Sequence, residues 1–215
     1  MRILVVGAGV YVNGRGSGGF GTIIPAIGEY ARRQGVEALT VVGKSDDGRE
    51  ATQAAVAAVE QRLGVELPTT FARADAMGTP SRDDFDCAIV SVPDQLHFEV
   101  TAPLLRRGLH SLVVKPLTPT LAEARQLCSL QRQAGVYGAV EFHKRFDEAN
   151  LLVRRMVDEG ELGRLSYATV QYSQRREVPL EHFVKWARET DVFQYLGVHY
   201  VDLLYHLTGF RPRRA

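Results

Sequence analysis

Residues 2–9 read RILVVGAG, and this stretch decides the fold. Its run of four aliphatic residues, Ile3 to Val6, has no polar residue in alternate positions, which is typical of a strand buried on both faces. Two glycines follow at once, where a tight turn lets the backbone approach a phosphate closely. Helical apolar spacing begins at Ile23. The order strand, glycine-rich loop and helix predicts a dinucleotide-binding unit.

The loop is longer than the usual fingerprint. Gly7 and Gly9 take the first two glycine positions of GxGxxG, but Val12 stands where the third glycine belongs. Gly21, just before the helix, replaces it if the loop carries an insertion of about nine residues. Arg15 within the loop is interpreted as a solvated arginine, with a phosphate contact as the alternative.

Strand-like and helical runs then alternate along the chain. The expected strands are 2–6, 38–42, 87–92, 111–114 and 136–142, and the expected helices are 23–34, 51–63, 97–107 and 121–134. This alternation predicts an α/β domain over residues 1–142, a Rossmann-type doubly wound parallel sheet. Residues 143–215, with helices at 148–159 and 193–207 and a strand at 165–172, are expected to form a partial substrate or oligomerisation domain, an incomplete α+β unit.

The end of the second expected strand bears on the cofactor. An acidic residue there usually accepts hydrogen bonds from the adenosine ribose, but Lys44 and Ser45 occupy that place. A cation and a hydroxyl suit a 2′-phosphate. The expected cofactor is NADP or NAD, with NADP preferred, although Asp46 or Asp47 would still serve NAD.

Composition narrows the class of partner. The net charge of +1 over 215 residues provides no field for nucleic acid or a membrane surface, so a small molecule is the expected ligand. The first apolar run is too short for a signal peptide or a membrane span, and we expect a cytoplasmic protein. Cys87 and Cys128 have no metal-ligand spacing and are expected to be reduced core residues.

Three motifs in order carry a resemblance to a family. Residues 86–97, DCAIVSVPDQLH, end a strand in a proline and then a histidine; Lys115-Pro116 follows the next strand; residues 197–202 read GVHYVD. Residues 142–147 and 160–163 extend the likeness over nearly the whole chain. The chain thus resembles the Gfo/Idh/MocA oxidoreductases, which are mostly NAD(P)-dependent dehydrogenases of sugars, sugar nucleotides and cyclitols.

The resemblance implies a set of site residues and a homo-oligomer. Oxidation of a secondary alcohol needs a hydride acceptor and a base, and Lys115 is expected either to take the hydroxyl proton or to stay charged and polarise a carbonyl. The expected cofactor-binding residues are Gly7, Gly9, Gly21, Lys44, Ser45, Ser91, Pro93, His97 and Lys115.

A predicted helix near the end of the chain supplies the remaining groups. His199 and Asp202 share one helical face with His206, and His199 is expected to bind the substrate hydroxyl and relay its proton. Asp202 is expected to orient His199 or cap a loop. Three ligands spread over two turns diverge, so no metal site is expected. The expected catalytic residues are Lys115, His199 and Tyr195, and the expected substrate-binding residues are Lys115, Lys144, Arg145, His199 and Asp202.

Two positions depart from the family pattern. Val114 replaces the glutamate of the Glu-Lys-Pro motif, and Tyr195 stands where many members have an aspartate, so an Asp-His pair cannot be carried over. The aromatic residues Phe183, Trp186, Phe193 and Tyr195 are expected to pack in a core, with stacking on a sugar face as the alternative. A non-catalytic dinucleotide-binding or scaffolding protein is the alternative function.

Overall fold

The computed structural model describes residues 1–17, 19–173, 176, 190–211 and 213. Contacts divide the chain into two compact units, Met1–Val140 and Glu141–Ala215. Each unit is described by itself below.

The first unit is built on one six-stranded sheet. Its strands lie in the order β3-β2-β1-β4-β5-β6, with the bounds β1 Arg2–Val6, β2 Ala38–Gly43, β3 Thr69–Arg73, β4 Cys87–Val90, β5 His110–Val114 and β6 Gly138–Glu141. The four pairs whose register is defined are parallel, with Val5 of β1 opposite both Val41 and Ile89. The strand order reverses between β1 and β4. In open parallel sheets ligands bind at the carboxyl ends of the strands at such a reversal.

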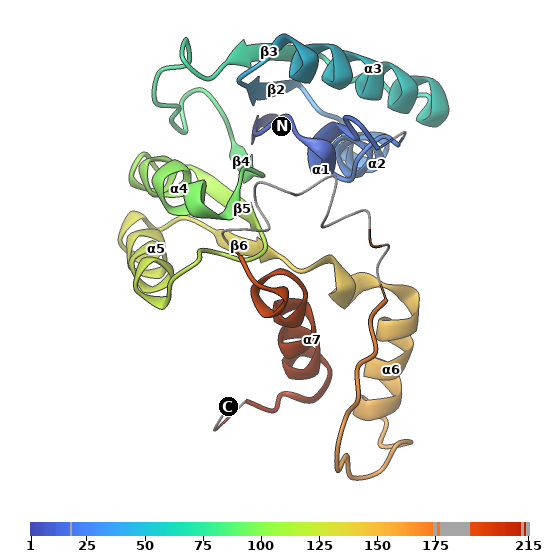
Figure 1. Ribbon diagram of the computed structural model, residues 1–215. Coiled ribbons are helices and arrows are strands. Elements are labelled where there is room, and N and C mark those ends of the chain that lie inside the picture. The colour runs from blue at the N-terminus through green and yellow to red at the C-terminus, as the bar shows by residue number, and fades with distance from the viewer. Residues whose placement is uncertain (18, 174–175, 177–189, 212, 214–215) are drawn as a thin grey trace. The chain divides into compact units, whose positions relative to one another are not determined.

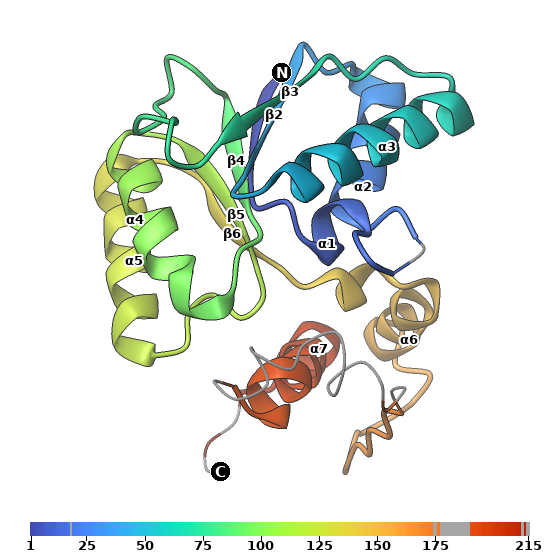
Figure 2. The ribbon, with the colours of Figure 1, turned by 45° about the horizontal axis from the view of Figure 1, so that its top comes forward.

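Helices cover both faces of this sheet (Figures 1 and 2). They are α1 Val10–Asn13, α2 Ile23–Gln34, α3 Asp46–Leu63, α4 His97–Arg106 and α5 Leu121–Ala134, with a 3-10 turn, η1, at Asp94–Leu96. Ile3 and Val5 belong to the core with α2 and α3, whereas Leu4 belongs to the opposite core with α4. Every residue at the centre of β1 is therefore buried, which confirms the two-sided burial predicted from its aliphatic run.

Three details of the first unit differ from expectation. Strand β3 was not predicted. Its residues are only partly buried, and a strand of this kind has only a weak apolar pattern in the sequence. Helix α3 begins at Asp46 because the Ser45 side chain accepts a hydrogen bond from the Gly48 N–H and caps it. Cys128 was expected in the core but is exposed, one position beyond the buried Leu127 of α5.

Gly7 joins β1 to the glycine-rich loop at a point where the backbone passes very close to the segment that follows β4. Its φ of +124° is one that L side chains rarely adopt, and an added Cβ would lie 1.9 Å from the Ser91 carbonyl oxygen that follows β4. The backbone is held there because the Gly7 N–H donates to Val42 and the Ser91 N–H donates to Val6. Only glycine fits this junction of three strands.

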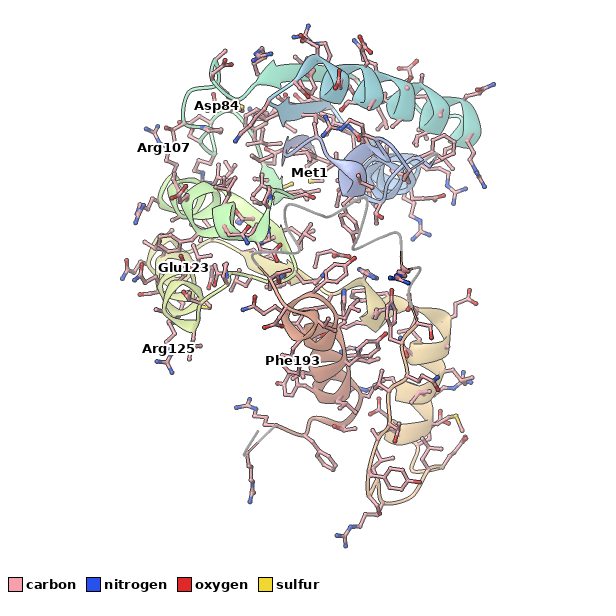
Figure 3. All side chains as sticks on the ribbon, viewed as in Figure 1. Met1, Asp84, Arg107, Glu123, Arg125 and Phe193 are labelled. Carbon is pink, nitrogen blue, oxygen red and sulfur yellow. The ribbon has the colours of Figure 1, made fainter. Side chains whose placement is uncertain are left out.

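The second unit is described mainly as helices. It contains the 3-10 turn η2 His143–Phe146, α6 Glu148–Asp158, the π-helical η5 Phe193–Gly197 and α7 Val198–Thr208. The strand predicted at 165–172 is wrong: these residues have no regular secondary structure, and no described strand of this unit lies beside them to complete a ladder. The side chain of Phe193, labelled in Figure 3, lies at the start of the final helical run and is largely exposed, so the core packing expected for it is wrong.

Substitution of Gly7 should destabilise the protein, whereas substitution of Gly9 should not. We expect Gly7→Ala to lower the free energy of unfolding by about 2 kcal/mol or more, because its Cβ meets backbone and its φ is strained. An added Cβ at Gly9 meets no atom within 4 Å, so Gly9→Ala should change that free energy by less than about 0.5 kcal/mol. Urea unfolding of both variants measures the difference, and equal losses would contradict the steric account.

Candidate functional site: the carboxyl edge of the sheet

The carboxyl edge of the sheet gathers most of the residues predicted to bind the cofactor. Gly7 follows β1, Lys44 and Ser45 follow β2, Ser91 and Pro93 follow β4, and Lys115 follows β5. Since β2, β1, β4 and β5 are consecutive and parallel, these segments lie side by side along one edge. Four separate stretches of sequence therefore meet around the reversal between β1 and β4.

The loop after β1 begins with the short helix α1. The chain then leaves α1 and returns to it over residues 14–21, a segment called the excursion below. Gly9 precedes α1, and the excursion leaves at Gly14 and returns at Gly21, where the Thr22 N–H donates to Tyr11 at 2.7 Å before α2 begins. Gly21 has a φ of +75°, and an added Cβ would lie 2.7 Å from the backbone nitrogens of Asn13 and Gly14. Gly21 thus allows the returning chain to pack on α1, and its contact with a cofactor stays a prediction.

Asn13 fixes the loop to the first turn of α3. Its side chain is buried and donates to the carbonyl oxygens of Ala8 and Gly48 and to the Thr52 hydroxyl, at 3.0 to 3.3 Å. Sequence reasoning missed Asn13, because nothing in the local pattern signals contacts this far along the chain. Its amide makes the glycine-rich turn a rigid element.

The geometry at Gly9 fits a dinucleotide pyrophosphate. Helix α1 begins directly after Gly9, and the Gly9 carbonyl oxygen accepts hydrogen bonds from the Val12 and Asn13 N–H groups. The space beside the Gly9 Cα is open, because no atom lies within 4 Å of where a Cβ would stand. An uncovered backbone beside the start of a helix is what lets a phosphate approach closely. These residues therefore fit the cofactor that the fold implies.

His97 has a structural contact that the sequence did not indicate. Its ring is buried, with Nδ1 2.7 Å from the Pro116 carbonyl oxygen and Nε2 3.0 Å from the Val92 carbonyl oxygen. The ring ties the segment after β4 to the segment after β5, next to Lys115. His97 was expected to line the nicotinamide pocket; the structure assigns both of its nitrogens to backbone, and contact with a nicotinamide stays a prediction.

In the second unit, two residues predicted as separate substrate contacts are paired with each other. The Arg145 guanidinium donates two hydrogen bonds to the Asp202 carboxylate, one of them at 2.7 Å, which links η2 to α7. Hydrogen bonding to Asp202 raises the pKa of Arg145 above its already high value, so the guanidinium stays charged. The sequence did not indicate this ion pair, and the expectation that Asp202 orients His199 or caps a loop stays a prediction.

His199 is buried beside His143. The two ring centroids are 4.8 Å apart in an edge-on arrangement, and the Phe142 ring centroid lies 6.3 Å from that of His199. His143 Nδ1 lies 3.1 Å from a carboxylate oxygen of Glu141. His143 and its partner Glu141 thus place a polar pair next to the predicted relay residue, and Glu141 was not among the residues predicted for the site.

Two further predicted residues of this unit are Tyr195, in η5, and Lys144, in η2. Tyr195 lies in the π-helical segment η5, which continues directly into α7; π-helical turns are frequent at functional sites. The Lys144 ammonium lies over the rings of Tyr172 and Tyr200, 5.7 and 5.9 Å from their centroids. Burial raises the pKa of Tyr200, which keeps its phenol protonated at neutral pH. Phe183 and Trp186 lie outside the described residues.

His206 is the third polar residue of the predicted face of α7. Burial, together with the nearby charges of Arg145 and Arg154, lowers the pKa of His206, so its ring is mainly neutral at pH 7. Within the described part of the chain, no group of three or more His, Cys, Asp or Glu side chains is arranged to hold a metal ion. Nor is any described helix long and apolar enough to cross a membrane.

Comparison with known proteins identifies the family. Residues 1–142 match the model described as "Oxidoreductase family, NAD-binding Rossmann fold", and residues 150–215 match the "GFO/IDH/MocA C-terminal domain". The chain therefore belongs to the Gfo/Idh/MocA oxidoreductase family. This agrees with the resemblance in the three sequence motifs and with the observed sheet order.

Individual relatives show how much of a family member the chain covers. It is 30% identical over 125 residues to the scyllo-inositol 2-dehydrogenase (NADP(+)) IolW of Bacillus subtilis, which is 58% of this chain and 35% of that protein. It is 32% identical over 133 residues to the 1,5-anhydro-D-fructose reductase of Ensifer adhaerens, 62% of this chain and 37% of that protein. The chain thus aligns with about a third of the length of these curated relatives.

A solved structure shows the same fold. The oxidoreductase domain protein of Kribbella flavida superposes with a TM-score of 0.70 at 23% identity, covering 98% of this chain and 53% of the other. At this identity the likeness concerns the fold alone.

The ion pair between Arg145 and Asp202 should stabilise the second unit more than an exposed pair does. Asp202→Ala leaves a partly buried guanidinium without its carboxylate, and we expect a loss of about 2 kcal/mol or more in unfolding free energy. The matched control is Asp158→Ala, which removes the exposed partner of Arg154 on α6 and should cost less than about 1 kcal/mol. Thermal and urea unfolding monitored by circular dichroism compare the two, and indistinguishable losses would contradict a structural role for Asp202.

Proposed function

We propose that this chain is part of an NAD(P)-dependent oxidoreductase that transfers hydride between a nicotinamide cofactor and a secondary alcohol or ketone of a polyhydroxylated substrate. The observation that carries the proposal is the junction of β1, the glycine-rich turn and α1, where Gly7 permits close strand approach and the space beside Gly9 is open. Membership of the oxidoreductase family supports the same conclusion.

The proposed substrate is a sugar, a sugar derivative or a cyclitol. The names of the two curated relatives, an inositol dehydrogenase and an anhydrofructose reductase, support this class. For the cofactor we propose NADP in preference to NAD, because Lys44 and Ser45 stand where a ribose-binding acid is usual and because the relative from Bacillus subtilis is named as NADP(+)-dependent. The cytoplasmic location and the homo-oligomer stay predictions.

Each predicted catalytic residue has a proposed task. The bound cofactor supplies the hydride acceptor or donor at its nicotinamide ring. Lys115 follows β5 and directly precedes Pro116, whose carbonyl oxygen contacts the His97 ring. We assign to Lys115 the exchange of a proton with the substrate oxygen or the stabilisation of charge on it. His199, next to Phe142 and His143, binds a substrate hydroxyl, and Tyr195 in the π-helical turn assists it. Lys144 contributes a positive charge for an anionic substrate group.

Substitution of Lys115 tests the assignment. Lys115→Ala should lower kcat at least about 100-fold, the usual size of a general acid-base contribution, while the Kd for NADPH changes no more than a few fold. Lys115→Arg keeps the positive charge but cannot release a proton, so it separates proton transfer from charge stabilisation. Steady-state oxidation of scyllo-inositol and reduction of 1,5-anhydro-D-fructose, with NADPH binding followed by fluorescence, provide the readouts.

The outcomes divide the two candidate functions. Turnover of either substrate that survives both substitutions would exclude Lys115 as the acid-base group. NADPH or NADH binding with no turnover of any polyol tested would favour the non-catalytic dinucleotide-binding protein. Binding of neither dinucleotide would contradict the proposal itself.

A further inference from the structure

The excursion in the glycine-rich loop brings an arginine to the end of β2. Arg15 follows Gly14, where the chain leaves α1, and its Nη1 donates to the Ser45 hydroxyl oxygen at 3.1 Å. Its backbone N–H donates to Asn13 Oδ1 at 3.1 Å. Since Asn13 is itself buried and bonded to α3, the start of the excursion is held against the same helix that Ser45 caps. The interpretation of Arg15 as a solvated arginine misses this contact.

The Ser45 hydroxyl retains one unused hydrogen-bonding function. Its oxygen accepts from Arg15 and from the Gly48 N–H at 3.2 Å, which occupies both lone pairs. Among the residues that the structure describes, no oxygen accepts the Ser45 hydroxyl proton. A phosphate oxygen next to Ser45 would accept that proton and a hydrogen bond from the Arg15 guanidinium, a charge-assisted pair of contacts.

Some of the cationic side chains around the end of β2 are paired with carboxylates and others are not. Arg49 and Arg73 each approach Asp46 at 4.0 Å, and Arg73 also bonds to Asp75, whose pKa is lowered by that bond. Arg15 and Lys44, in contrast, form no ion pair with any described residue. The two uncompensated cations therefore flank Ser45, where a dianionic group is favoured over a neutral ribose diol.

We propose that Arg15 and Ser45, with Lys44, bind the 2′-phosphate of NADP, and that Arg15 in the loop excursion is the main determinant of NADP over NAD. This inference rests on the proposed function, because it places a group of the same dinucleotide. With the pyrophosphate at Gly9 and the adenosine ribose at the end of β2, as the proposed function has them, Arg15 would approach the ribose from the first loop. A chain without the excursion would have no residue in the place of Arg15.

The competing interpretation is that Arg15 contacts the pyrophosphate, which NAD and NADP share. The two interpretations differ in which ligand loses affinity when the guanidinium is removed. The probe 2′,5′-ADP carries the 2′-phosphate without pyrophosphate or nicotinamide, whereas ADP-ribose carries pyrophosphate without a 2′-phosphate.

Isothermal titration of four proteins tests the assignment: wild type, Arg15→Gln, Arg15→Lys and the control Arg62→Gln. Arg62 lies in the last turn of α3, about 25 Å from Ser45 at 1.5 Å per residue. Its substitution by Gln removes the same charge as Arg15→Gln does. We expect Arg15→Gln to weaken NADPH and 2′,5′-ADP at least about tenfold, the usual effect of one charged hydrogen bond, and to change NADH and ADP-ribose less than about twofold. Arg15→Lys should recover part of the loss, and Arg62→Gln should bind like wild type.

Several different results would contradict the assignment of Arg15 to the 2′-phosphate. Equal weakening of NADPH and NADH, with a parallel loss for ADP-ribose, would place Arg15 on the pyrophosphate and overturn the assignment. Unchanged binding of NADPH by Arg15→Gln would overturn it as well. If wild-type protein bound NADH and NADPH equally, the determinant would be refuted while the proposed function stood; if it bound neither, the proposed function would fall first.

Discussion

The first unit depends on the close approach of β1 to β4 at Gly7. The sheet reverses its strand order between these two strands, and the chain must leave β1 directly beneath the segment that leaves β4. With 1.9 Å between a hypothetical Cβ of residue 7 and the Ser91 oxygen, a side chain there would force the strands apart. The same junction aims the start of α1 at the carboxyl edge. A steric constraint on one residue thus sets where the glycine-rich loop leaves the sheet.

Contacts from distant parts of the chain keep this junction rigid. Asn13 fixes the turn to α3, and His97 joins the segments after β4 and β5 through two carbonyl oxygens. Pre-organised groups of this kind lower the cost of ordering a site when a ligand binds. In the second unit the ion pair between Arg145 and Asp202 has the same effect, because it holds η2 against α7, where His199 is buried. Several residues expected to touch ligands therefore act first on their neighbours.

The sequence was sufficient for the fold because β1, β2 and β4 are short aliphatic runs with turn residues after them, and helical periodicity separates them. It was insufficient where structure depends on partners: β3 is a half-exposed edge strand, and residues 165–172 have strand-like composition without a described strand beside them. The glycine loop, Lys44, Ser45, Ser91 and Lys115 were found because they directly follow predicted strands. Asn13, the contact between Arg15 and Ser45, and the pairing of Arg145 with Asp202 were not, since they join residues 30 and more positions apart.

The backbone between Gly7 and Tyr11 is the proposed binding place of the dinucleotide pyrophosphate. Amide hydrogen exchange with and without saturating NADPH measures this directly, because hydrogen bonds to phosphate oxygens slow the exchange of the N–H groups that donate them. We predict that the amides of residues 8–11 gain more protection than any other segment of the first unit. Unchanged exchange in those residues, under conditions where titration shows NADPH to be bound, would contradict the account.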